Sequence, residues 1–319
     1  MTLYPLLLDP ALHVKVWGGR KLETLLNKTL PTDEPYGESW EMHDSAKVAN
    51  GELAGKRLSE VLAEYGHDLI GAANDPADGL PLLAKVLDAE QWLSVQVHPN
   101  DEQAKALEDE PRGKTEAWYV LAAEPGAKLV IGLTPGTTPQ QMEQAIRDNT
   151  LEKLLVYAEV VPGDMLLVSA GTVHALGMGI VVYEIQQSSD RTYRLYDWGR
   201  LGLDGKPRPL HIEKSIQVAN LATLPEIIHT GSDPAQIVDI VSTDYFTTQL
   251  YQLNEENGTR INLDTQGERF HCLTCIEGAA TITTPEMTVA LEMGRTALIP
   301  ANLGAYYLDG PARVLCSFQ

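Results

Sequence analysis

The chain has 319 residues, of which 44% are hydrophobic and 21% charged, values typical of a globular protein rather than a disordered or fibrous one. Its net charge of −20 disfavours nucleic acid and anionic membranes as partners, because both require clustered lysine and arginine. At roughly 150 residues per domain, this length predicts about two domains.

Membrane insertion and secretion are also disfavoured. No unbroken apolar run approaches the roughly 20 residues of a membrane span, and the first residues lack the basic start and cleavage site of a signal peptide. The chain has only three cysteines, Cys272, Cys275 and Cys316, an odd number that does not indicate a set of structural disulfides. An odd separation on a strand sends Cys272 and Cys275 to opposite faces, which argues against a zinc knuckle. We therefore expect a cytoplasmic protein.

The helical signals lie mostly in the first half of the chain. Residues 56–70 place apolar side chains at i, i+3, i+4 and i+7, which predicts one amphipathic helix. Asn100 is positioned to cap a second helix, and Thr138 followed by proline specifies the start of a third. Asn149, with a glutamate three residues later, predicts the cap of a further short helix.

Most of the remaining chain reads as short strands bounded by Gly, Pro and Asp. In the first part the predicted strands are residues 81–89, 92–98, 115–123, 128–133, 164–170, 179–187 and 192–198. Later the pattern is almost purely β, at residues 237–242, 246–253, 270–278, 279–284, 287–291, 295–302, 305–310 and 313–318. Such runs predict a sandwich or barrel. The connection at residues 221–236 predicts two domains, residues 1–235 and residues 236–319.

Residues 92–98 carry the most informative pattern. On a strand their apolar side chains share one face, and Ser94, Gln96 and His98 share the other. This polar face contains none of the Lys, Glu or Asp residues that usually face solvent. Gln96 and His98 lie about 7 Å apart along the strand, close enough for both side chains to converge on one ion.

Two later segments supply further ligand types. The strand that follows residue 113 places Glu116 between Lys114 and Trp118 on one face, and a glycine turn presents His174 at a strand end. One amide, two imidazoles and one carboxylate form a mixed nitrogen and oxygen set that suits Zn²⁺, and also Mn²⁺, Co²⁺ or Fe²⁺. The predicted ligands of this single divalent metal are Gln96, His98, Glu116 and His174.

These motifs, in this order, resemble the type I mannose-6-phosphate isomerases (phosphomannose isomerases) in their short bacterial form, within the cupin superfamily. The resemblance covers most of residues 1–235 and rests on KVWGG at 15–19, GESWE at 37–41, and the segments 83–101, 113–121, 162–177 and 183–200. It implies a mainly β fold, with a cupin double-stranded β-helix (jelly-roll) catalytic domain that carries a few helices. The tail from about residue 237 is similar only in general, as a smaller cupin-like β domain without a metal set.

The resemblance also implies an activity, the zinc-dependent interconversion of mannose 6-phosphate and fructose 6-phosphate through a cis-enediol, with one zinc ion per chain. By similarity the four predicted ligands bind that zinc, and Arg194 matches the catalytic arginine of the family. Lys85, Lys114 and Glu184 resemble further active-site positions, and the proton-transfer base stays open among them. Two alternatives remain, a cupin-fold Fe(II) dioxygenase and a sugar-binding cupin without catalysis.

Overall fold

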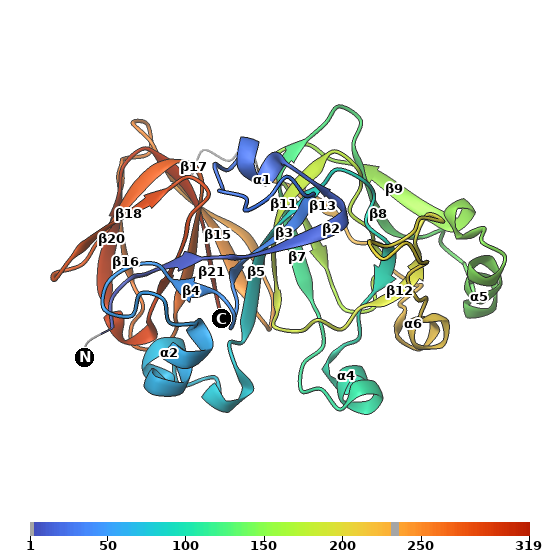
Figure 1. Cartoon of the computed structure of the whole chain (residues 1–319), viewed down its shortest axis with the longest axis horizontal. Coiled ribbons are helices and arrows are strands. Elements are labelled where there is room, and N and C mark those ends of the chain that lie inside the picture. Colours follow the sequence, from blue (N-terminus) through green and yellow to red (C-terminus); the bar gives the residue numbers. More distant parts are fainter. Residues whose placement is uncertain (1–2, 231–235) are drawn as a thin grey trace.

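A computed structural model describes residues 3–230 and 236–319 of the chain, and it is mainly β, as predicted (Figure 1). Residues 231–235 of the predicted connection lie outside the described residues. The described residues contain no helix long and apolar enough to cross a membrane.

The first barrel is built around a seven-stranded antiparallel sheet. Its strand order is β13-β10-β7-β11-β5-β3-β2. The strands are β2 (Ala11–Gly19), β3 (Tyr36–Met42), β5 (Leu82–Ala89), β7 (Glu116–Ala123), β10 (Asp164–Val168), β11 (Ile180–Gln187) and β13 (Ile227–His229).

A second, smaller layer faces this sheet. It contains two ladders, β6 (Val95–Val97) with β12 (Tyr193–Tyr196) and β8 (Lys128–Leu133) with β9 (Leu155–Glu159). Single bridges from Gln96 to His174 and from Val130 to Ala175 join the two ladders through the segment around His174. Leu129 of this layer packs in one core cluster with Trp118 of the seven-stranded sheet. The two layers therefore enclose a common interior.

The second barrel lies beside the first and contains the C-terminal strands (Figure 1). Its strands are β1 (Leu6–Asp9), β4 (Lys47–Val48), β14 (Ile237–Ser242), β15 (Thr247–Leu253), β16 (Arg260–Asp264), β17 (His271–Thr283), β18 (Thr288–Glu292), β19 (Thr296–Ile299), β20 (Ala305–Asp309) and β21 (Ala312–Phe318). Strand β1 pairs with β19, so the N-terminal strand belongs to the sheet of the C-terminal half. The domain boundary at residue 235 stays a prediction.

The two barrels share a buried core. Tyr183 on β11 packs there with Leu298 and Leu315 of the C-terminal half. The Tyr183 hydroxyl also lies 3.0 Å from the Ser317 hydroxyl oxygen. Because side chains alternate along a strand, Tyr183 faces the second barrel and its neighbour Glu184 faces the interior of the first. The seven-stranded sheet is therefore covered on both faces.

The helices lie around the barrels (Figure 1). They are α1 (Lys21–Thr24), α2 (Leu58–Tyr65), α3 (His67–Ile70), α4 (Asp101–Glu108), α5 (Pro139–Arg147) and α6 (Ile212–Val218), with short 3₁₀ turns at Pro76–Asp78, Leu151–Leu154 and Ala301–Leu303. The predicted caps of α4 and α5 are confirmed, because Asn100 Oδ1 accepts the Gln103 N–H at 2.8 Å and Thr138 Oγ1 accepts the Gln141 N–H at 3.2 Å.

One helix prediction and one cap prediction are wrong. Residues 56–70 do not form one helix, because Gly66 adopts φ 51° and separates α2 from α3. A positive φ is a conformation that glycine adopts without steric cost, and it interrupts the helix despite continuous apolar spacing. Asn149 caps no helix either, since its own φ is 54° and the 3₁₀ turn that follows begins at Leu151.

Two strand predictions also need correction. The strand expected at residues 92–98 is only three residues long, Val95–Val97. The two strands expected at residues 270–278 and 279–284 form one strand, β17, which accommodates Gly278 at φ 69° beside a register shift between Cys275 and Glu277. The two nearby cysteines lie in different core clusters and are unpaired, as the alternation argument predicts.

Candidate active site

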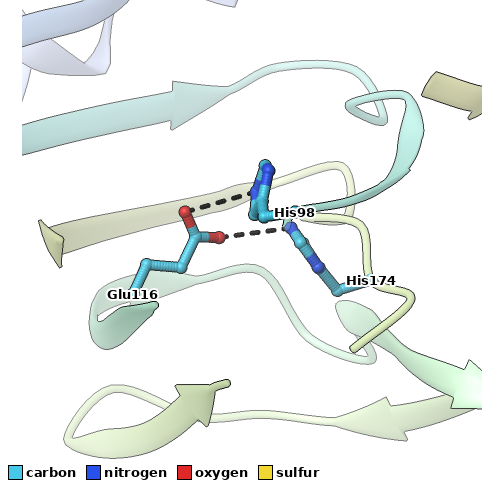
Figure 2. A group of neighbouring side chains, drawn as sticks. All are labelled: His98, Glu116 and His174. Carbon is cyan, nitrogen blue, oxygen red and sulfur yellow. Dashed lines mark ion pairs between the residues drawn. The ribbon is translucent and has the colours of Figure 1, made fainter. Parts of the chain in front are cut away.

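Three of the predicted metal ligands meet inside the first barrel. His98 directly follows β6, Glu116 begins β7, and His174 lies in the segment that bridges to Gln96. Their donor atoms all lie within 4.8 Å of one another. In Figure 2 the Glu116 carboxylate points toward both imidazoles. Its Oε2 lies 3.5 Å from His98 Nε2, and its Oε1 lies 3.2 Å from His174 Nε2. All three side chains are buried.

Backbone carbonyls fix the tautomers of the two imidazoles. His98 Nδ1 lies 2.9 Å from the carbonyl oxygen of Arg191, and His174 Nδ1 lies 2.8 Å from that of Thr172. A carbonyl can only accept, so each Nδ1 carries the proton and donates it. The lone pair of each Nε2 is then directed at the Glu116 carboxylate, as is usual for histidines that ligate a metal.

The charges of the site follow from burial and from one lysine. Lys114 Nζ lies 2.7 Å from Glu116 Oε2 and 3.4 Å from His98 Nε2. Burial and the Lys114 ammonium lower the pKa of His98 to about 3, which keeps this imidazole neutral. Burial alone would raise the pKa of the Glu116 carboxyl, but the Lys114 ammonium holds that pKa well below its usual range. An ionised carboxylate and a neutral imidazole are the ligand forms a metal requires.

The donor set fits a divalent metal. Among the described residues, neither buried oxygen of Glu116 has a hydrogen-bond partner of regular geometry, although Lys114 forms an ion pair with Oε2. A buried carboxylate with unfilled acceptor positions is rare unless an ion or water completes it. Gln96 borders the set on the predicted face, with its side-chain Nε2 3.3 Å from His174 Nε2. If the oxygen and nitrogen of this side-chain amide exchange positions, the oxygen lies where Nε2 now lies, next to His174 Nε2.

A cavity of about 360 Å³ opens beside this cluster. Its lining contains Gln96 and all four predicted catalytic residues, Lys85, Lys114, Glu184 and Arg194. A volume of this size falls within the usual range for small-molecule sites. A larger cavity of about 820 Å³ lies elsewhere, between Lys28 and Arg295, and contains none of the predicted residues. The smaller cavity is therefore the candidate active site.

Lys85 and Glu184 form an ion pair in the lining of the cavity. They are register partners on β5 and β11, with Lys85 Nζ 3.1 Å from Glu184 Oε1. The Trp118 indole N–H donates to Glu184 Oε2 at 2.8 Å, and Lys85 also donates to Gln186 Oε1 at 2.6 Å. Both side chains of the pair are nearly buried, so their orientation toward the cavity is constrained.

Arg194 approaches the cavity from β12. It is the register partner of Gln96, its Nε donates to Ser94 Oγ at 3.2 Å, and its Nη1 donates to the Pro209 carbonyl at 3.1 Å. The neighbouring Arg191 instead pairs with Glu110 at the surface and lines a different cavity. Of the two arginines, the structure thus brings Arg194 to the site.

Several residues of the cavity escaped the sequence analysis. Lys15, which forms a 3.0 Å ion pair with Glu38, and Trp40 lie in segments that served only to recognise the family. Ser94 was visible as part of the polar face. Arg208 lies on a loop without regular pattern, and no signal in the sequence could have identified it.

Comparisons with known proteins agree with this arrangement. The family model described as phosphomannose isomerase type I, catalytic domain, matches residues 6–138, and the mannose-6-phosphate isomerase cupin domain matches residues 236–319. Mannose-6-phosphate isomerase ManA of Bacillus subtilis is 36% identical over 99% of both chains. A mannose-6-phosphate isomerase of Streptococcus mutans is 34% identical over 98% of both chains.

A solved structure shows the same fold over the whole length. The crystal structure of the mannose 6-phosphate isomerase from Bacillus subtilis matches with a TM-score of 0.86 and 31% identity, covering 99% of both chains. This match confirms the predicted cupin architecture, and the full-length relatives confirm the predicted family. The chain therefore belongs to the type I mannose-6-phosphate isomerase (phosphomannose isomerase) family.

Proposed function

We propose that this chain is a zinc-dependent aldose–ketose isomerase that interconverts mannose 6-phosphate and fructose 6-phosphate. One observation carries the proposal. The buried His98, Glu116 and His174 cluster adjoins a cavity that also presents Lys85, Glu184 and Arg194. Metal ligands, acid–base groups and a cation thus surround one space of substrate size, in a family whose relatives are named for this reaction.

The metal would be held by His98, Glu116 and His174, with Gln96 as a fourth ligand. Nitrogen and oxygen donors in this combination suit zinc, while Mn²⁺, Co²⁺ and Fe²⁺ remain chemically compatible. A bound zinc ion supplies Lewis-acid stabilisation of negative charge on the sugar oxygens. The carbonyls of Arg191 and Thr172 hold both imidazoles in the ligating tautomer before any metal arrives.

The reaction moves a proton between neighbouring carbons. A base removes the proton from C2 of the open-chain aldose, the cis-enediol forms, and a proton returned to C1 gives the ketose, while the hydroxyl proton passes from O2 to O1. Of the groups that line the cavity, Lys85, Lys114 and Glu184 are the predicted candidates for the exchange of this proton. Trp118 and Lys85 fix the Glu184 carboxylate, which would hold it at constant orientation through both transfers.

Arg194 supplies fixed positive charge. A guanidinium stays protonated at neutral pH, so it can stabilise an enediolate or an anionic substituent without a change in its own charge. Its bonds to Ser94 and to the Pro209 carbonyl hold it at the cavity wall. Stabilisation by such preorganised donors requires no reorganisation during the reaction.

A coupled assay tests this proposal directly. Purified protein should convert mannose 6-phosphate to fructose 6-phosphate, lose the activity with a chelator, and regain it when zinc is added back. The activity should be the same without oxygen, because isomerisation consumes none and a dioxygenase would need it. Activity that survives complete removal of metal would overturn the zinc assignment, and absence of conversion with zinc bound would overturn the substrate assignment.

The cellular location belongs to the same proposal. All three cysteines are buried and unpaired, which suits a reducing compartment such as the cytoplasm. Fractionation of the native organism, with the isomerase activity as marker, tests this location.

A further inference from the structure

A separate cavity lies at one end of the second barrel. Its volume is about 640 Å³, and its lining comes mainly from the places where β16 and β21 end and where β17 and β20 begin. Further along this barrel, an apolar core that includes Leu273 and Cys316 fills the interior. The cavity has the size of a small-molecule site and shares no residue with the candidate active site. A barrel can hold one small ligand where its side chains leave the end unfilled.

Arg269 supplies hydrogen-bond donors to this cavity. Its guanidinium lies over the ring of Phe318, with Cζ 5.0 Å from the ring centre. The Arg269 side chain forms no ion pair and no hydrogen bond with the described residues. The aromatic ring therefore holds the guanidinium by a cation–π contact, while the five N–H donors of the guanidinium stay open to a ligand.

His271 lines the same cavity with a neutral imidazole. The residue is only 5% exposed, and its Nδ1 lies 2.7 Å from the hydroxyl oxygen of Tyr306. Burial and the nearby Arg269 charge lower the pKa of the His271 imidazole to about 4, against the opposing charge of Asp264. Because the tyrosine hydroxyl engages Nδ1, the nitrogen left for a ligand is Nε2. A neutral imidazole can donate or accept there, according to its tautomer.

Acceptors of the cavity come from β16. Asn262 and Asp264 lie two residues apart on this strand and therefore on the same face. Asp264 Oδ1 accepts the Gln266 N–H at 2.7 Å, which leaves Oδ2 for a ligand. Although Asp264 and Arg269 line one cavity, they form no ion pair with each other. The cavity thus presents a cation, a carboxylate, an amide and a neutral imidazole to the same space.

These groups fit a neutral ligand with many hydroxyls better than an ion. An anion would meet the Asp264 carboxylate in a chain of net charge −20, and a cation would meet the Arg269 guanidinium. A hydroxyl can donate to a carboxylate and accept from a guanidinium, so a sugar can use both charged groups. The Phe318 ring, 5.5 Å from the His271 ring between their centres, adds an apolar wall for the C–H groups of a sugar.

We propose that the cavity at the end of the second barrel, bounded by Arg269, His271 and Asp264, binds a neutral hexose. This site would be separate from the candidate active site. It requires no metal and no turnover, so the proposal does not rest on the proposed function.

Calorimetric titration of the full chain with mannose tests the site. Mannose should bind with a dissociation constant of the order of a few millimolar, as expected for a ligand of about 12 non-hydrogen atoms. Arg269→Gln and Asp264→Asn should each raise that constant about tenfold or more, because each removes a charged hydrogen-bond partner. Arg260→Gln is the matched control and should leave it unchanged, since Arg260 lies over Tyr307 in the same barrel but outside the cavity.

The first barrel must be excluded as the source of the binding. Glu116→Gln, which removes a proposed metal ligand there, should bind mannose as the wild type does. Binding that is lost in Glu116→Gln and kept in Arg269→Gln would place the sugar in the first barrel and overturn the proposal. No binding by the wild type at ten times the expected dissociation constant would also overturn it. Citrate that binds more tightly than mannose, and loses its affinity in Arg269→Gln, would overturn the assignment to a neutral ligand.

Discussion

The two buried glutamates of the site offer a sharp test, because they share an environment and differ in their assigned roles. Glu116 and Glu184 each form a nearly buried ion pair with a lysine, at 2.7 Å and 3.1 Å respectively. We predict that Glu116→Gln abolishes metal binding and activity together, and that Glu184→Gln abolishes turnover while zinc stays bound. Glutamine preserves the size of each side chain, so packing changes little.

The expected magnitudes follow from these environments. Breaking one partner of a buried ion pair costs about 3 kcal/mol in either variant, so the loss of stability without metal should be similar. Zinc at a hundred times its dissociation constant stabilises a folded protein by about 2.7 kcal/mol. This gain should appear in the wild type and in Glu184→Gln. It should be absent in Glu116→Gln, since changes outside the ligand shell alone already cost tenfold to a hundredfold in affinity.

Three measurements decide the outcome. Denaturant unfolding with and without zinc gives the stabilisation, elemental analysis after dialysis gives the metal content, and the coupled assay gives kcat, which should fall by about a hundredfold or more in Glu184→Gln. Zinc affinity near the wild-type value in Glu116→Gln would refute the metal assignment. Loss of zinc from Glu184→Gln would show that the two carboxylates do not have separate roles.

Other predictions concern single residues. Arg194→Ala should lower kcat/KM by a hundredfold or more with zinc retained, as removal of a preorganised donor does, and a change below tenfold in the coupled assay contradicts a catalytic role. Burial raises the pKa of the Asp88 carboxyl to about 6. Because the folded state binds this proton more tightly, wild-type stability falls as pH rises through the window from about 4 to 6. Asp88→Asn should therefore be more stable than wild type by up to about 3 kcal/mol at roughly pH 8 and equal to it below about pH 4, as urea unfolding can measure. Gly177→Ala would place a Cβ 1.7 Å from the Lys128 carbonyl oxygen, so it should destabilise by about 3 kcal/mol, and unchanged unfolding would refute the close approach.

The residues of the site were predictable where alternation along a strand or a turn motif marks them. Gln96 and His98 share a polar face that lacks solvent-facing charges, and the structure places both beside His174. Helix starts with a side-chain cap, as at Asn100 and Thr138, were predictable for the same local reason. Strand alternation and helix caps depend on residues that are close in the sequence, so they can be predicted before the fold is known.

Long-range features were not predictable in this way. Strand β1 is a short apolar run whose partner, β19, lies almost 300 residues away, and nothing local indicates that it joins the C-terminal sheet. Gly66 interrupts an apolar pattern that would otherwise predict one helix. Arg208 lines the cavity from a loop, and its guanidinium donates two hydrogen bonds to Asp197.

The site exists only where the two layers of the first barrel meet. His98 and His174 come from the smaller layer, whereas Glu116, Lys85 and Glu184 come from the seven-stranded sheet. Alternation directs Glu184 inward and Tyr183 outward, and Tyr183 is packed against the second barrel. The C-terminal half thus buries the outer face of the strands whose inner face carries the proposed acid–base groups. The second barrel therefore packs against the strands that carry Lys85 and Glu184, and it contributes no residue to the described cavity of the first barrel.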